Sequence, residues 1–375
     1  AFAAIKADGS VVTWGDANCG GSDSSAVAAL LTEGVVQICA SDNAFAAIKA
    51  DGSVVTWGDR GCGGNSSAVA ALLTEGVFQI CASDSAFAAI KADGSVVTWG
   101  DRSCGGNSSA VARLLTEGIV QICGNNSAFA AIKADGSVVT WGDRNCGGDS
   151  SAVAALLTEG VVQIRRSHMA FAAIKTDGSV VTWGYANCGG DSSAVAALLT
   201  DGVFQICGSA MAFAAIKADG SVVTWGGRSC GGDSLAVAEL LTEGAVQIFA
   251  SHRAFAAIKA DGSVVTWGDA GCGGDSSAVA ALLTEGVVQI CRSQMAFAAI
   301  KADGSVVTWG GRSCGGDSLA VAALLMDGIV QICANNVAFA AIKADGSVVT
   351  WGDAGCGGDS SAVATLLIEG VVQVC

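Results

Sequence analysis

The chain contains no proline and little of several other residue types. Its 375 residues include two histidines, one tyrosine and four methionines, and only 14% are charged. Globular domains average about a quarter charged residues, and 51% of this chain is hydrophobic. These proportions exclude an acidic, disordered type of protein. No uninterrupted apolar run approaches the roughly 18 residues that a membrane helix needs, so we expect no membrane partner.

Clustered positive charge is also missing. Lys and Arg number 19 against 34 Asp and Glu, which gives a net charge of −15. The nine lysines are evenly spread, and each stands two residues before an aspartate. Because neutralisation of a phosphate backbone needs clustered Lys and Arg, this distribution argues against nucleic acid as a ligand. An acidic surface instead favours solubility or basic partners.

No catalytic constellation is visible in the chain. His168 and His252 are the only histidines, and neither has a Cys, Asp or Glu at catalytic or metal-ligand spacing. Aspartates such as Asp135 recur singly, whereas general acid–base chemistry needs two unlike carboxylates in one pocket. We therefore expect a protein that is not an enzyme and has no cofactor and no metal ion.

The strongest feature that is present is an internal repeat. The string AFAAIK occurs nine times, at intervals of 42 residues after a first interval of 43, and the extra residue falls in Gly20–Asp23. One such unit cannot bury a core alone and must stack on its neighbours. The repeats of this one array are residues 1–43, 44–85, 86–127, 128–169, 170–211, 212–253, 254–295, 296–337 and 338–375, the last incomplete. A start on a repeat boundary without Met indicates a fragment of a longer array.

Sixteen cysteines fall into two columns of the repeat. Nine follow a Trp-Gly pair: Cys19, Cys62, Cys104, Cys146, Cys188, Cys230, Cys272, Cys314 and Cys356. Seven end a Val-Gln-Ile segment: Cys39, Cys81, Cys123, Cys207, Cys291, Cys333 and Cys375. Two repeats have Arg165 or Phe249 at the second position, so a bridge between the columns would leave unpaired thiols. Without zinc-type spacing, these are expected to be free thiols in a reducing compartment, which favours an intracellular protein, cytoplasmic or nuclear.

The fourth repeat predicts two strands joined by a tight turn. Residues 128–133 and 137–142 read as strands, and Asp-Gly between such runs is the strongest short hairpin signal. With Asp135-Gly136 as a two-residue turn, Ile132 faces Val139. One face would then carry Ile132, Val139 and Trp141, and the other Phe129, Ala131, Val138 and Thr140. Both faces are apolar, so we expect the hairpin to be covered on both sides.

A short helix and a third strand complete the predicted unit. Val153, Leu156 and Leu157 form an apolar stripe at helical spacing. Asp149 or Ser150 can cap its N-terminus, so the Gly-Gly-Asp-Ser stretch is interpreted as a cap and turn in preference to a phosphate loop. Residues 161–164 follow as a strand. The predicted unit is strand, strand, short helix, strand.

In all nine units, the repeat resembles that of the regulator-of-chromosome-condensation family. The resemblance rests on DGSVVTWG, the Gly-rich turn after it, GVVQI and AFAAIK. The resemblance implies a mainly β fold, either a β-propeller-like ring or an open solenoid of nine β-β-α-β units. The unit is shorter than that of the family, and a helix replaces a strand. Family members act in guanine-nucleotide exchange on a small GTPase and in partner recognition by HECT-type ubiquitin ligases.

Each repeat contains one tryptophan at the end of an apolar strand, which could be taken for a stacking platform. Its place in the strand favours a core residue. These structural positions are Trp14, Trp57, Trp99, Trp141, Trp183, Trp225, Trp267, Trp309 and Trp351.

Positions that differ among the copies are the candidate binding residues. They lie mainly in the three-residue loop before AFAAIK, and a second variable column carries Arg60, Arg102, Arg144, Arg228 or Arg312 in some copies. Equivalent positions superpose in a stack, so each column should follow one edge. The candidate partner-binding residues are Asp42, Asn43, Asp84, Asn125, Asn126, Arg166, His168, Met169, Met211, His252, Arg253, Arg292, Gln294, Met295, Asn335 and Asn336.

The sequence thus favours a non-enzymatic protein–protein interaction scaffold with unidentified protein partners, such as the recognition region of a larger protein of the ubiquitin-ligase type. Two alternatives stay open. One is a purely structural spacer or surface array without a dedicated ligand. The other, by family analogy alone, is a guanine-nucleotide exchange factor.

Overall fold

The computed structural model describes residues 1–16 and 24–374. Contacts divide the chain into two compact units. Unit I comprises Ala1–Ala7, Trp14–Asp16 and Ser193–Cys375, and unit II comprises Asp8–Thr13 and Ala17–Ser192. The extra residue of the first repeat, Cys19 and Cys375 lie outside the described residues.

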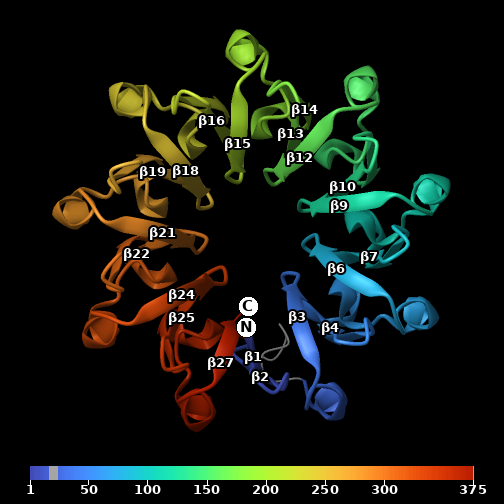
Figure 1. The fold of residues 1–375 in the computed structure, drawn as a ribbon, viewed down its shortest axis with the longest axis horizontal. Coiled ribbons are helices and arrows are strands. Elements are labelled where there is room, and N and C mark those ends of the chain that lie inside the picture. The colour runs from blue at the N-terminus through green and yellow to red at the C-terminus, as the bar shows by residue number, and fades with distance from the viewer. Residues whose placement is uncertain (17–23, 375) are drawn as a thin grey trace. The chain divides into compact units, whose positions relative to one another are not determined.

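Unit II contains four three-stranded antiparallel sheets (Figure 1). Their strands are β3 (Val35–Ala40), β4 (Ala44–Lys49) and β5 (Val54–Gly58); β6 (Val77–Ala82), β7 (Ala86–Lys91) and β8 (Val96–Gly100); β9 (Ile119–Gly124), β10 (Ala128–Lys133) and β11 (Val138–Gly142); and β12 (Val161–Arg166), β13 (Ala170–Lys175) and β14 (Val180–Gly184). The helical segments are η2 (Ser25–Leu30), η4 (Ser67–Leu72), η6 (Ser109–Leu114) and η8 (Ser151–Leu156), with the shorter turns η3 (Arg60–Gly64), η5 (Arg102–Gly106), η7 (Arg144–Cys146) and η9 (Ala186–Cys188).

Unit I repeats this arrangement. Its strands are β15 (Val203–Gly208), β16 (Ala212–Lys217) and β17 (Val222–Gly226); β18 (Ala245–Ala250), β19 (Ala254–Lys259) and β20 (Val264–Gly268); β21 (Val287–Arg292), β22 (Ala296–Lys301) and β23 (Val306–Gly310); β24 (Ile329–Ala334), β25 (Ala338–Lys343) and β26 (Val348–Gly352); and β27 (Val371–Val374) with β1 (Phe2–Lys6). β2 (Val11–Trp14) belongs to the same sheet as β1. The helical segments are η10 (Ser193–Leu198), η12 (Leu235–Leu241), η14 (Ser277–Leu282), η16 (Leu319–Leu324) and η18 (Ser361–Leu366), with the turns η11 (Arg228–Cys230), η13 (Ala270–Cys272), η15 (Arg312–Cys314) and η17 (Ala354–Cys356).

The fold is mainly β with one short helix per repeat, which confirms the predicted fold class. The described residues form nine three-stranded sheets. Each sheet is offset from the sequence repeat. The third strand of one repeat pairs with the first strand of the next, as β9 does with β10. The third strand of the last repeat, β27, pairs with β1 of the first repeat. The variable loop before AFAAIK is therefore a hairpin loop within one sheet. Among the described residues, no helix has the length and apolar character to cross a membrane.

The predicted register of the Asp-Gly hairpin is wrong by one residue. Ile132 pairs with Val138 and Ala131 with Val139, so the loop holds three residues, Ala134 to Gly136. The Asp135 carboxylate accepts hydrogen bonds from the Ser137 N–H at 2.9 Å and from its hydroxyl at 2.6 Å. The Gly136 N–H donates to the Lys133 carbonyl at 2.8 Å. These local bonds between side chain and backbone fix the longer loop.

This shift of one residue also changes which side chains share a face. Phe129 pairs with Trp141, and their rings stack with centroids 5.3 Å apart. Phe129, Ala131, Val139 and Trp141 therefore face the preceding sheet. Ala128, Ala130 and Ile132 face the following sheet. The prediction that both faces are covered is confirmed, because all of these side chains are buried.

The tryptophans are core residues, as predicted, and they also join neighbouring repeats. The described tryptophan side chains are at most 5% exposed. The indole N–H of Trp141 donates to the Gly105 carbonyl at 3.0 Å, and that of Trp183 donates to Gly147 at 3.1 Å. Each of these bonds ties a strand to the turn that follows the Trp-Gly pair of the preceding repeat.

The short helix differs from the prediction in its type and in its buried face. It is a 3₁₀ helix whose last residue, Leu156, is 53% exposed, whereas Leu157 directly after it is buried. A 3₁₀ helix has three residues per turn, so the expected stripe at α-helical spacing does not form. Asp149, not Ser150, accepts the N-terminal bond, from Ser151 N–H at 2.9 Å. The Ser150 hydroxyl instead bonds to Thr140 at 3.1 Å.

Candidate protein-binding surface

The middle residues of the variable loops lie next to one another within each unit. In unit II, the Asp42 N–H donates to the Asp84 carbonyl at 3.1 Å, Asp84 to Asn126 at 3.2 Å, and Asn126 to His168 at 3.1 Å. The predicted column of variable residues is thus a continuous row held by main-chain bonds. We call the middle residues of these loops the loop belt.

Unit I builds the same row from other side chains. The Ala210 N–H donates to the His252 carbonyl at 2.8 Å, His252 to Gln294 at 2.7 Å, and Gln294 to Asn336 at 2.8 Å. Because only the backbone makes these bonds, the side chain at each belt position is free to vary without loss of the row.

The first residue of each loop is structural, which corrects the predicted role of Asn125. Asn125 is fully buried; its amide donates to the Cys146 carbonyl at 2.6 Å, and its side-chain oxygen accepts from Ala128 at 2.9 Å. Asn335 makes the equivalent bond to Cys356 at 2.7 Å. Ser83 does the same with Cys104 at 2.8 Å. Because Asn125 is buried, it offers no surface to a partner. Nothing in the sequence separates it from its neighbour Asn126.

The third loop residues are partly buried among neighbouring repeats. Met169 and Met295 pack against the cores between sheets, whereas Met211 is exposed. The Asn43 amide lies 3.8 Å from the Cys62 sulfur. Arg292 is exposed at the end of β21, and Asn336 is exposed in unit I. The belt and its flanks therefore present a mixed surface of polar residues and methionine.

Two belt carboxylates and an arginine come together in unit II. Burial raises the pKa of Asp84 to about 6, with a further rise from the nearby Asp42 charge and a smaller opposing effect of Arg166. Burial also raises the pKa of Asp42, and Arg166 opposes this shift as well. Arg166 stands where most other repeats have Ala or Gly. The sequence predicted these three residues as candidates but not that they approach one another across repeats.

Replacement of Asp84 by asparagine is expected to stabilise unit II above neutral pH. The folded-state pKa of about 6 exceeds the ordinary 3.8, so the folded state binds the proton more tightly. The stabilising contribution of protonated Asp84 is complete below about pH 4 and is lost as pH rises through about 6. Solvent screening of this part-exposed group limits the gain to below about 1 kcal/mol. Urea unfolding of parent and variant at pH 5 and pH 8 measures it; a difference that does not change between these pH values would contradict the prediction.

In unit I, His252 and Arg253 lie beside a buried thiol and a carboxylate. The Arg253 Nε–H donates to the Cys230 sulfur at 3.3 Å, and its guanidinium lies 4.0 Å from Asp269. Burial, assisted by the Arg253 charge, lowers the pKa of His252. His252 is therefore neutral at physiological pH. Within residues 1–16 and 24–374, no group of three or more His, Cys, Asp or Glu side chains is placed to hold a metal ion.

The thiols of Cys123 and Cys146 are poor nucleophiles. Burial raises the pKa of Cys123 to about 12, and burial together with the Asp143 charge raises that of Cys146 to about 11. Only the thiolate is nucleophilic. These thiols therefore stay protonated and packed at neutral pH.

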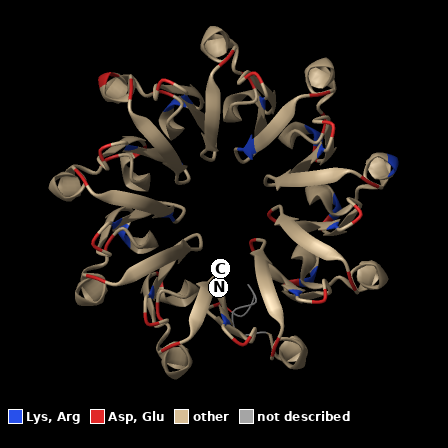
Figure 2. Ribbon diagram, viewed as in Figure 1, with Lys and Arg blue, Asp and Glu red and all other residues tan. Residues whose placement is uncertain are grey.

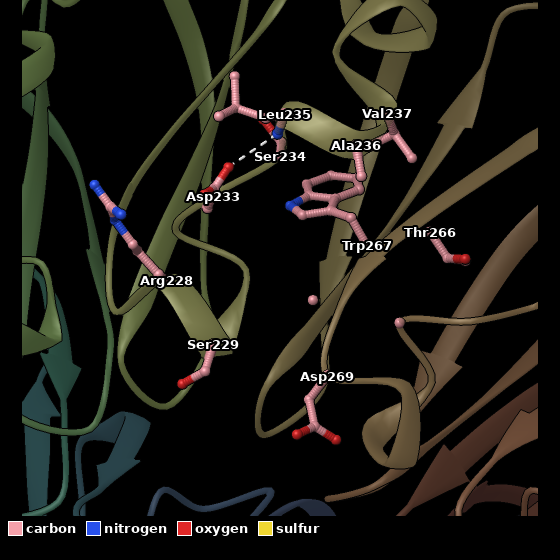
Figure 3. A pocket seen from close by; sticks show the side chains of 12 residues that line it. Arg228, Ser229, Asp233, Ser234, Leu235, Ala236, Val237, Thr266, Trp267 and Asp269 are labelled. Carbon is pink, nitrogen blue, oxygen red and sulfur yellow. Dashed lines mark hydrogen bonds between the residues drawn. The ribbon is translucent and has the colours of Figure 1, made fainter.

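The second variable column borders grooves between repeats of unit I. A groove of about 650 Å³ lies between Arg228, Asp233 and Leu235 of one repeat and Trp267 and Asp269 of the next (Figure 3). The Asp233 carboxylate accepts from the Leu235 N–H at 3.0 Å, and the Leu235 side chain is 81% exposed. A second groove of about 480 Å³ is lined by Asp275, Arg312 and Leu319 among others. Leu235 and Leu319 replace the serine of most repeats, a signal that sequence reasoning missed.

The fold defines a tandem-repeat protein built from three-stranded antiparallel sheets. No protein-family model matches the chain, and no curated protein matches it. Solved structures with a similar fold include the CRINKLY WD40 ectodomain of the Arabidopsis thaliana receptor kinase ACR4, at 16% identity and a TM-score of 0.41, covering 78% of this chain and 96% of that one. Human WBSCR16 is 12% identical, with a TM-score of 0.44 and coverage of 89% and 96%. Prp20p of Saccharomyces cerevisiae is 14% identical, with a TM-score of 0.39 and coverage of 85% and 72%.

Proposed function

We propose that this chain is a non-enzymatic protein-interaction scaffold whose partner contacts lie on the loop belt. The observation that carries the proposal is the contrast between constant and variable positions. The strands AFAAIK and VVTWG are identical in all nine repeats, whereas the belt positions carry Asp, Asn, His, Ala or Gln. A rigid frame that holds differing side chains in a row is suited to recognition of an extended partner surface.

The electrostatic environment supports a binding role over a chemical one. The high pKa of the Cys123 and Cys146 thiols leaves them without nucleophilic character, and His252 is held neutral among buried groups. Several weak contacts along one row would add by avidity. It stays a prediction that this chain is the recognition region of a larger, ubiquitin-ligase-type protein. The spacer and nucleotide-exchange alternatives stay predictions as well. A nucleotide-release assay with small GTPases tests the exchange alternative.

Conversion of the belt to alanine is expected to remove the partners that contact the belt while the fold is kept. The variant replaces Asp42, Asp84, Asn126, His168, His252, Gln294 and Asn336; Ala210 already has alanine at this position. Main-chain bonds hold the belt, so thermal stability should change little. The measurement is quantitative proximity labelling in cells with parent and variant.

A matched control replaces seven exposed serines at the start of the helical segments, outside the belt, with alanine: Ser25, Ser67, Ser109, Ser151, Ser193, Ser277 and Ser361. The control should keep the parent's labelled proteins. If the belt variant also keeps them all, the binding face lies elsewhere and the proposed role of the belt is wrong.

A further inference from the structure

The segment between the helix and the third strand exposes apolar side chains in every repeat. In the fourth repeat, Leu156 at the helix end and Val162 in β12 are each 53% exposed. Single exposed apolar residues are normal, but here the same two positions are exposed in all copies. They are Leu30, Leu72, Leu114, Leu156, Leu198, Leu240, Leu282, Leu324 and Leu366, and Val36, Phe78, Val120, Val162, Phe204, Val246, Val288, Val330 and Val372.

An exposed acidic residue lies between these two positions in each repeat. In the fourth repeat it is Glu159, and the set is Glu33, Glu75, Glu117, Glu159, Asp201, Glu243, Glu285, Asp327 and Glu369. We call the combination of Leu156, Glu159, Val162 and their equivalents the rim strip. Figure 2 shows acidic residues recurring beside the helices, whereas the helices themselves are almost uncharged.

The hairpin turn adds a second carboxylate to the same edge. Val161 N–H donates to the Gly136 carbonyl at 3.0 Å, which places the turn that holds Asp135 against the rim strip of its own repeat. Ala134 N–H donates to Gly118 of the preceding repeat at 2.8 Å. Hydrogen bonds from Ser137 lower the pKa of Asp135, so this carboxylate stays ionised at physiological pH.

In several repeats the protein itself engages the single lysine at this edge. Lys175 pairs with Val161 in the ladder, and its ammonium donates to the Leu156 carbonyl at 3.1 Å. It thereby ties the two ends of the rim strip together. Lys259 and Lys301 make the equivalent bond, each at 3.1 Å. With two carboxylates and one ammonium per repeat, the edge has a net negative charge at every copy.

We propose that the rim strip docks a segment of another protein in which Lys or Arg alternates with apolar side chains. The apolar side chains would cover Leu156 and Val162, and the cations would pair with Glu159 and Asp135. A second copy of this chain is a poorer occupant, because it would bring a like-charged strip from a chain with a net charge of −15. This docking role rests on the proposed scaffold function and specifies the chemistry of one partner segment. The residues of the rim strip are separate from those of the loop belt.

The test uses an eight-residue peptide of alternating Lys and Leu as the probe, titrated into the full chain by calorimetry. We expect several peptides to bind per chain. A peptide of alternating Lys and Ser has the same charge and should bind at least tenfold more weakly, because it cannot cover the exposed leucine and valine. The belt-alanine variant should bind the Lys/Leu peptide as the parent does, so failure of the belt proposal and failure of this one are distinguishable.

Two triple variants with equal charge change locate the site. The first variant, E159Q/E243Q/E285Q, removes three carboxylates of the rim strip. The second, A186R/A270R/A354R, adds three arginines at positions where other repeats already have arginine. Each variant makes the net charge of −15 less negative by three. The first should weaken binding at three of the nine strips by about twofold each, the typical size of an exposed ion pair. The second should leave those strips unchanged. Four results would each overturn the proposal: equal effects of the two variants, equal binding of both peptides, no peptide binding, or self-association of the chain in sedimentation.

Discussion

Replacement of Phe129 by alanine is expected to destabilise unit II by about 3–5 kcal/mol, the usual cost of removing a buried phenylalanine. The Phe129 side chain is fully buried and stacks on Trp141 with centroids 5.3 Å apart. It packs in one cluster with Ala86, Ala88 and Ile90 of the preceding sheet. The two alanines have no side-chain atoms beyond Cβ that could fill the space, so much of the cavity would remain.

The repeat architecture determines how this loss should appear. The stability of a repeat array is approximately a sum of unit terms and nearest-neighbour interface terms. The substitution weakens the interface between the sheets of β7 and β10, so amides of those strands should lose hydrogen-exchange protection before the others. Urea unfolding measures the total loss and hydrogen exchange measures its location.

Phe78 is the matched control for this prediction. It is also a phenylalanine of unit II but is 52% exposed. Its replacement by alanine should cost no more than about 0.5 kcal/mol, as for most surface substitutions. Equal losses for the two variants would show that Phe129 does not hold the sheets together.

The sequence predicted the strands and the buried tryptophans because each is encoded within one repeat. Apolar residues on both faces of AFAAIK predict a covered strand, and the structure buries both faces. The predicted length of the Asp-Gly turn was wrong by one residue, because the same residues fit a two-residue or a three-residue loop. The choice depends on the two bonds from Ser137 to Asp135, which the spacing of apolar residues does not reveal.

Contacts between repeats could not be read from the sequence. The approach of Asp42, Asp84 and Arg166 brings together residues of the first, second and fourth repeats. Burial of Asn125 depends on the Cys146 carbonyl, 21 residues further along the chain. The exposure of Leu156 follows from a 3₁₀ turn in place of an α turn, and both are compatible with the same apolar letters. The sequence located the variable surface, and the packing of neighbouring repeats decides which of its residues face outward.

Replacement of Gly105 by alanine is expected to cost about 2–5 kcal/mol. Gly105 has φ of +90°, and a Cβ there would lie 2.5 Å from Cδ2 of the Phe129 ring. A left-handed backbone costs a residue with a Cβ about 1–2 kcal/mol, and forced overpacking adds about 1–3 kcal/mol. Any backbone shift that relieves the overlap would also move the Gly105 carbonyl away from the Trp141 indole N–H, which it accepts at 3.0 Å.

Gly370 separates these two contributions, because it has φ of +73° but no atom within 4 Å of the position that a Cβ would occupy. Gly370→Ala should therefore show the backbone cost alone, about 1–2 kcal/mol. Urea unfolding of both variants gives the difference, and the near-ultraviolet circular dichroism of the tryptophans reports on the indole bond. If the two variants lose equal stability, the Phe129 ring yields freely to the added methyl group, and the tight packing of the Gly105 turn against the next sheet would not be a source of stability. If the free energy of unfolding falls at least about 1 kcal/mol more for Gly105→Ala than for Gly370→Ala, packing of this turn against the Phe129–Trp141 pair is a main source of stability between successive repeats.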